Sequence, residues 1–153
     1  MTSPETLTIA PALRRQWLAV LARAQTQQLA ELLPPALTTP HFIRAAEIGM
    51  VMLRARAGGS GEAFNLGEAS VTRCALRFGN GPLGVGYTLG RDRPKAELIA
   101  SFDALLQDPL RHAELFVTVI EPLAAAQAQA RQAASRAAAE SRVEFFTFVR
   151  GNS

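Results

Sequence analysis

The sequence has little cysteine, and it has no long hydrophobic run. Its one cysteine, Cys74, excludes a disulfide within the chain and fits a reducing compartment. No apolar run reaches the roughly 18–20 residues that a membrane span needs, and the N-terminus lacks the basic and apolar segments of a secretory signal. These absences predict a cytoplasmic protein with no membrane partner.

Lysine is nearly absent as well: of the sixteen Lys and Arg residues, only Lys95 is a lysine. Arginine forms bidentate contacts with phosphates and carboxylates, but an arginine excess can also reflect only the base composition of a genome. The arginines are scattered along the chain, whereas nucleic-acid binders gather charge on one face of a recognisable module. The hypothesis of a nucleic-acid-binding module therefore has only the net charge of +3 in its favour, and we expect no nucleic-acid partner.

Motifs for catalysis or metal binding are missing too. The chain has no HExxH, EF-hand or CxxC pattern, and no Ser/His/Asp order. His41 and His112 lie far apart and lack acidic or cysteine neighbours at metal-ligand spacing. Carboxylates such as Asp103 are expected on exposed helix faces. The sequence therefore predicts no catalytic residue, no metal site and no cofactor bound by this chain itself.

Hydrophobic periodicity predicts a single α+β domain over residues 1–153, with residues 1–11 expected to be disordered. Apolar residues at helical spacing predict two short helices before Pro34, and helices return after Gly90. The middle of the chain predicts a four-stranded antiparallel meander, flanked by the N- and C-terminal helices. The expected strands are 48–56, 62–66, 69–78 and 83–89, with turns at 67–68 and 79–82.

Alternation along the last two strands assigns their faces. The apolar face is expected to hold Cys74, Leu76 and Phe78, then Leu83, Val85, Tyr87 and Leu89. The opposite face would carry Arg73 and Arg77, then Gly84, Gly86 and Thr88. Bare glycines would let a backbone or a partner approach closely, and the apolar side favours a buried structural thiol at Cys74.

A glycine-rich loop, formed by Gly58, Gly59 and Gly61 before Glu62, joins two of the expected strands. Its amides could cradle a phosphate, although no Gly-Lys-Ser/Thr ending follows, so it is not a P-loop. A plain strand connection and a binding or close-packing role both stay open. The GxGxxG match at residues 79–84 lies between strand patterns and is better explained as a hairpin turn.

The loop supports an alternative function, a standalone phosphate- or nucleotide-binding enzyme. It would use the loop with a basic strand face made of Arg54, Arg56, Arg73 and Arg77. The nearest expected carboxylates, Glu62 and Glu68, cannot neutralise four guanidinium groups. This face would then meet an acidic partner or a phosphate, or remain solvated.

The C-terminal residues 122–151 predict a long Ala-rich helix and an aromatic tail. Between Leu123 and Glu140 the helix carries no further large apolar residue, and the tail that follows holds Phe145, Phe146 and Phe148. Burying a Phe side chain contributes roughly 1.5–3 kcal/mol, so these rings should pack on the domain body or on another chain. We expect this arm and tail to contact partners.

Several blocks of sequence taken together resemble a known family. They are residues 43–64, with the glycine loop, residues 67–75, and residues 141–151, together with 15–22 and 90–92. From about residue 12 to residue 151 the chain is similar to the PhnG family, whose members form one component of the bacterial carbon–phosphorus lyase core complex.

The resemblance implies an accessory or structural subunit in organic phosphonate catabolism. Family members join subunits H, I and J in a symmetric core with two copies of each, and L joins transiently. With H, I and L, a PhnG protein supports displacement of adenine from ATP by methylphosphonate, which gives ribose 1-methylphosphonate 5-triphosphate. The J component later breaks the carbon–phosphorus bond. The resemblance transfers no catalytic residue to this chain, and the complex, not this chain alone, uses ATP.

Overall fold

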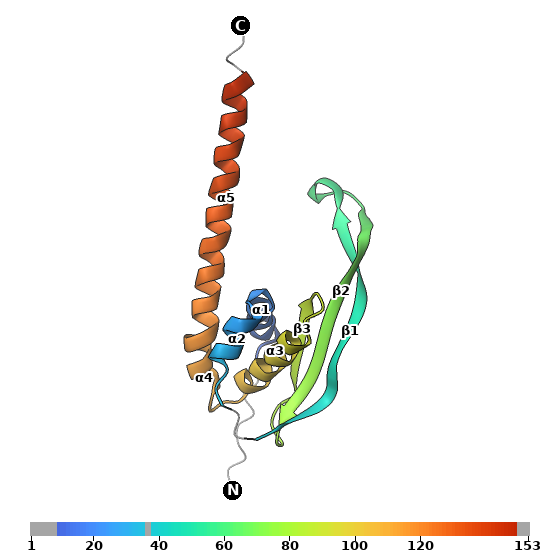
Figure 1. Ribbon diagram of the computed structural model, residues 1–153, viewed down its shortest axis with the longest axis vertical. Coiled ribbons are helices and arrows are strands. Elements are labelled where there is room, and N and C mark those ends of the chain that lie inside the picture. Colours follow the sequence, from blue (N-terminus) through green and yellow to red (C-terminus); the bar gives the residue numbers. More distant parts are fainter. Residues whose placement is uncertain (1–8, 36–37, 150–153) are drawn as a thin grey trace.

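The computed structural model describes residues 9–35 and 38–149 of the chain, with side chains described through Ser141. Two helices come first, three strands follow, and helices close the chain (Figure 1). The helices are α1 (Pro11–Arg23), α2 (Thr26–Leu32), α3 (Arg93–Leu106), α4 (His112–Leu115) and α5 (Glu121–Val149). The strands are β1 (Pro40–Arg56), β2 (Ala63–Phe78) and β3 (Gly84–Leu89). The α+β class is as predicted.

Helix α3 is the centre of the molecule, because it lies between the sheet and the other helices (Figure 1). Asp92 caps its N-terminus: the carboxylate accepts a hydrogen bond from the Lys95 amide at 3.0 Å. A stripe of alanines packs against the sheet, and the large side chains on the opposite side meet α1, α2 and the C-terminal helices. The alanine stripe is Ala96, Ala100 and Ala104, and the large side chains include Ile99, Phe102 and Leu106.

The sheet of the described residues has three antiparallel strands in the order β1-β2-β3, so the expected fourth strand is wrong. The predicted strands 62–66 and 69–78 are one strand, β2. Leu53 pairs with Gly67 and Arg54 pairs with Asn65, so Leu66 is an extra residue in the ladder. The Gly67-Glu68 sequence therefore marks a β-bulge rather than a turn. The turn after Phe78 is as predicted, with Gly79 at φ 55°.

The faces of β3 are the reverse of the prediction. Gly84, Gly86 and Thr88 are buried, whereas Tyr87 and Leu89 are 49% and 64% exposed. The reason is the close approach of α3: a β-carbon on Gly84 would overlap the Ala100 carbonyl oxygen. The predicted close approach at the glycines is real, but the element that approaches is α3 rather than a partner.

The chain continues as a helix from His112 to Val149, so the expected interruption at Pro122 does not occur. A π-helical turn at Phe116–Ile120 ends two residues before the proline, which lies in the first turn of α5. The wider turn accommodates a residue that has no N–H to donate to the preceding turn. Leu123 is buried, and every residue from Gln129 to Ser141 is exposed. The Ala-rich part of α5 thus leaves the domain body, as its composition predicts.

Candidate functional site

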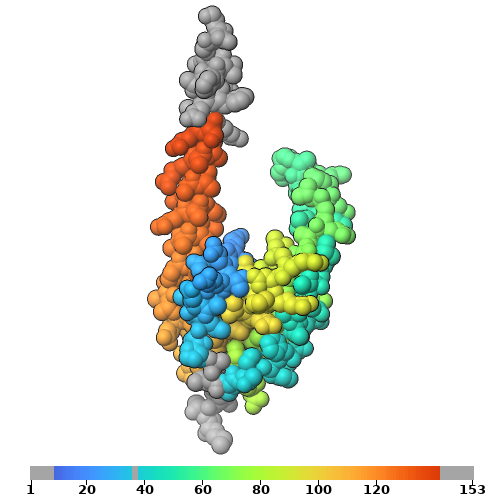
Figure 2. Space-filling model, in the orientation of Figure 1, coloured from blue at the N-terminus to red at the C-terminus, as the bar shows by residue number. Residues whose placement is uncertain are grey.

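Two elements project from the body in the same direction, and an open space separates them (Figure 2). One is α5. The other is a two-stranded ribbon, made of residues 50–56 of β1 and 63–70 of β2, which runs beyond the end of β3. Because β3 pairs only with Val71–Leu76 of β2, the ribbon has no third strand to support it.

The ribbon carries large apolar side chains in water. Met50 is 57% exposed, Met52 51% and Leu66 64%, and Leu53 and Phe64 are exposed as well. A two-stranded ribbon alone is marginally stable in water, and a contiguous exposed apolar patch usually marks an interaction site. The ribbon is therefore the best candidate for a partner-binding surface among the described residues.

The outer face of the sheet, which is the face turned away from α3, carries an ion-pair cluster centred on Glu47. Its Oε1 atom accepts hydrogen bonds from Arg44 and from Arg73, each at 2.6 Å. These hydrogen bonds, that of Arg44 first, lower the pKa of Glu47 below its ordinary value. Sequence reasoning missed this partner, because Glu47 meets Arg73 only through the pairing of β1 with β2.

Arg77 lies on the same outer face, two residues along β2 from the position opposite Arg44. Its Nε atom is buried and has no hydrogen-bond partner within the described part of the chain. Only Arg44 and Arg73 bond the Glu47 carboxylate, and Arg77 lies further along the same face, so this face has an excess of positive charge. Such an excess suits a phosphate or an acidic side chain.

The expected face of four arginines does not form. Arg54 and Arg56 lie two and four residues after Met52, so they share the face of β1 that carries Met50 and Met52, which pair with Ser70 and Glu68 of β2. They therefore lie on the opposite face from Arg73. The prediction that Glu62 and Glu68 are the nearest carboxylates is also wrong, since the carboxylate that pairs with Arg73 is that of Glu47.

The glycine loop forms the tight turn at the tip of the ribbon. Gly58 and Gly59 have φ values of 62° and 77°, and a β-carbon on Gly61 would come within 2.6 Å of the Ala57 carbonyl oxygen. Glycine is thus required by the turn itself. Arg56, next to the loop, lies nine positions along the strand from Glu47, which is roughly 30 Å. The glycine loop with Glu62 and the arginines Arg73 and Arg77 of the outer face therefore lie too far apart to form one binding site.

The aromatic residues of the C-terminus are part of α5, whose backbone is helical through Val149. Their side chains lie outside the described residues, so their packing stays a prediction. They are Phe145, Phe146 and Phe148. The expected separate tail after the helix is replaced by a continuation of the helix itself.

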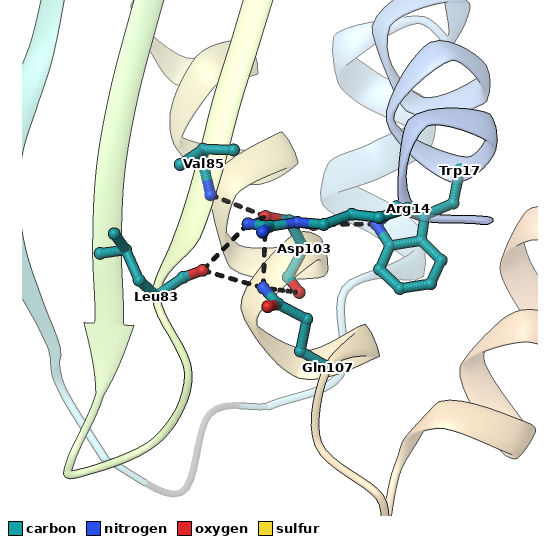
Figure 3. A network of polar contacts seen from close by, with 6 residues as sticks. All are labelled: Arg14, Trp17, Leu83, Val85, Asp103 and Gln107. Atoms are coloured by element: carbon teal, nitrogen blue, oxygen red, sulfur yellow. Dashed lines mark hydrogen bonds and ion pairs between the residues drawn. The ribbon is translucent and has the colours of Figure 1, made fainter. Parts of the chain in front are cut away.

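A buried carboxylate, Asp103, ties α1, β3 and α3 together (Figure 3). It accepts hydrogen bonds from Arg14 at 2.7 Å, from Trp17 Nε1 at 2.8 Å and from the Val85 amide at 2.8 Å. The prediction of an exposed helix face for this residue is wrong. The signal was present in the sequence, because Asp103 follows Ile99 by one helical turn on the buried stripe. We assign the network to stability, since it holds elements together and leaves no oxygen open to a ligand.

The remaining candidate groups are structural. Cys74 is buried, as predicted, and desolvation raises the pKa of its thiol from 9.0 to about 11, with a smaller contribution from Glu97. The His112 ring packs between Trp17 and Phe116, with ring centroids 5.6 and 5.7 Å away.

Within residues 9–35 and 38–149, no group of three metal-ligating side chains occurs. No helix in that part of the chain has the length and apolarity to cross a membrane.

A packed α+β body with two exposed projections is typical of a protein that assembles with others. Comparison with known proteins agrees with this class. Residues 12–151 match the family described as "Phosphonate metabolism protein PhnG". A protein of Rhizobium meliloti (strain 1021), named alpha-D-ribose 1-methylphosphonate 5-triphosphate synthase subunit PhnG, is 39% identical over 142 residues, which cover 92% of this chain and 90% of that protein. The chain belongs to the PhnG family of phosphonate metabolism proteins, as its sequence blocks predict.

Proposed function

We propose that this chain is an accessory subunit of an alpha-D-ribose 1-methylphosphonate 5-triphosphate synthase within a carbon–phosphorus lyase core complex. Its partners are subunits H, I and J, with two copies of each core subunit, and L joins transiently. Together with H, I and L it supports displacement of adenine from ATP by a phosphonate. The family and the name of the relative support this role.

The observation that carries the proposal is the exposed ribbon. Met50, Met52 and Leu66 are each more than half exposed, on a pair of strands that nothing in the described chain covers. Burying apolar surface stabilises by about 25 cal/mol per Å². A partner that covers the ribbon gains this energy, and a chain without its partners forgoes it. The same feature explains why the chain would act within a complex.

The Glu47 cluster has a more specific role in this proposal. Arg73 and Arg77 contact either an acidic surface of a partner or the triphosphate of ATP bound in the complex. One carboxylate shared between Arg44 and Arg73 leaves positive charge unanswered, and the buried Nε of Arg77 adds a donor that needs an acceptor. Gly58, Gly59, Gly61 and Glu62 at the ribbon tip, and the phenylalanines of α5, are assigned to partner contacts. The chain itself binds no cofactor.

Turnover tests the role directly. The purified chain is incubated with ATP and methylphosphonate, and adenine release is measured with and without subunits H, I and L. An accessory subunit gives no turnover alone, and omitting it from the mixture abolishes or strongly reduces turnover. The competing function is a standalone nucleotide-binding enzyme, and it would be favoured by adenine release from this chain alone.

A further inference from the structure

Strand β1 leaves one of its edges without a partner. It is the first strand in the order β1-β2-β3, so within the described residues only its β2 side is hydrogen-bonded. Between Glu47 and Leu53 the pairing with β2 is regular, from Arg73 to Gly67. In a regular antiparallel ladder every second residue directs its N–H and C=O away from the neighbouring strand. Residues 47–53 therefore present a row of free backbone groups along the outer edge.

This edge lacks the devices that usually protect an exposed strand. Native proteins blunt such edges with proline, lysine, bulges or very short strands. Register irregularities do occur between β1 and β2, but they fall between Phe42 and Glu47 and after Leu53, on either side of the regular stretch. Within the stretch, Met50, Met52 and Leu53 are exposed, and they lie on both faces of the strand. A free, regularly paired and apolar edge of this kind is a template for another strand.

The charge at the end of this edge indicates the chemistry of the incoming strand. Arg54 and Arg56 are exposed, and neither forms an ion pair among the described residues. Glu47 is already shared by Arg44 and Arg73. A second copy of this chain would bring further arginines to the same edge. An acidic segment of a different subunit would complement it.

We propose that an extended segment of another synthase subunit adds to the sheet along residues 47–56 of β1. That segment carries apolar side chains opposite Met50 and Met52, and acidic side chains opposite Arg54 and Arg56. Backbone hydrogen bonds supply the affinity and the flanking side chains supply the specificity, as in other cases of strand addition. This inference rests on the proposed function and specifies how the ribbon is covered.

Amide hydrogen exchange, measured residue by residue, tests the inference. The full chain is compared alone and in the complex purified after co-expression with the remaining subunits. In the chain alone, alternate amides of residues 48–53 exchange slowly because they bond to β2. In the complex we expect the other set to slow by roughly tenfold or more, because those amides acquire acceptors.

Each outcome decides one claim. If the complex forms but the outward amides keep exchanging at their free rate, strand addition is wrong and the proposed function stands. If no complex forms, the proposed function fails, and the inference fails with it. If the outward amides become protected in the chain alone as its concentration rises, the occupant is a second copy and our assignment is overturned.

Charge reversal tests the acidic character of the incoming strand. The variant with both Arg54→Glu and Arg56→Glu should bind the partner at least about tenfold more weakly, because like charges then face each other across the new ladder. The control is Arg91→Glu, an exposed arginine in the β3–α3 connection. Unchanged slow exchange in α3 shows that the variant is folded. Equal affinity of the double variant and the control would contradict an acidic strand.

Discussion

Gly86 in β3 lies so close to Ala96 in α3 that a β-carbon on Gly86 would overlap the Ala96 carbonyl oxygen. This contact fixes the distance between the sheet and the central helix. It also places the ribbon relative to the helical body, because β3 and the ribbon belong to the same sheet. The contact therefore links the packing of the body to the position of the proposed interface.

The first prediction is that Gly86→Ala destabilises the fold by roughly 1–3 kcal/mol, because the added methyl group forces the helix away from the sheet. Denaturant unfolding of the purified chain measures this loss. The matched control is Gly49→Ala, since no atom lies within 4 Å of a β-carbon there. The control should stay within about 0.5 kcal/mol of the wild type. Equal stability of the two variants would contradict the close contact.

The second prediction concerns the buried network. Asp103→Asn should lower the free energy of unfolding by about 3 kcal/mol, because Arg14, Trp17 and the Val85 amide lose their shared anionic acceptor. Arg14→Gln should cost less, since the Arg14 side chain is 33% exposed and Asp103 keeps its other two donors. The comparison is made by denaturant unfolding at neutral pH. A larger loss in Arg14→Gln than in Asp103→Asn would reverse the assigned roles.

The third prediction is a loss of stability at alkaline pH that depends on Cys74. Burial raises the pKa of the Cys74 thiol to about 11, above its ordinary value of 9.0. The folded state therefore keeps this proton where the unfolded state has released it. The resulting stability is fully present below about pH 9 and is lost as the pH rises towards about 11. Between about pH 8 and about pH 10.5 the free energy of unfolding should fall less in Cys74→Ala than in the wild type. Identical pH dependence in the two proteins would contradict the role of the Cys74 thiol.

The fourth prediction concerns the arginines of the outer face. The double variant with Arg73→Gln and Arg77→Gln should weaken either assembly or ATP-dependent turnover, because it removes two positive charges from this face. Lost co-purification identifies a protein interface, and intact assembly with a raised KM for ATP identifies a phosphate contact. Arg91→Gln serves as the control for a change at an exposed arginine elsewhere. If the double variant assembles and turns over normally, this face is merely solvated.

The fifth prediction concerns α5. Truncation after Glu140 removes Phe145, Phe146 and Phe148 and should abolish complex formation while the domain body stays folded. The body should survive because residues 129–141 are already exposed and contribute no core contact. Co-purification of the truncated chain and thermal unfolding of the chain alone are the measurements. Normal co-purification would refute the anchoring role, and an insoluble truncated chain would assign these rings to the chain's own core.

Local patterns predicted most of the helices well. The spacing of Leu13, Trp17 and Leu21 predicts α1, and the alternation around Cys74 and Leu76 predicts the buried face of β2. The Asn80-Gly81 turn is correct for the same reason. In each case the information lies within a few neighbouring residues, where periodicity and turn preference act directly.

The errors in the sheet have a common cause, which is contact between residues far apart in sequence. Gly67 looks like a turn until its pairing with Leu53 shows that β2 continues through a bulge. The glycine face of β3 looks like the outer face until α3 is placed against it. Glu47 finds Arg73 only through the register of β1 and β2. Neither close packing nor register can be read from single-strand alternation, so the candidate cluster around Glu47 required the structure.

The most direct test of the account is the mass of the assembly that the full chain forms. The chain is co-expressed with subunits H, I and J, purified through a tag on one of the other subunits, and measured by native mass spectrometry. We predict a single complex that contains two copies of this chain and two of each partner. A complex of the partners that lacks this chain, at saturating expression of all four, would contradict the central claim that it is a subunit of the assembly.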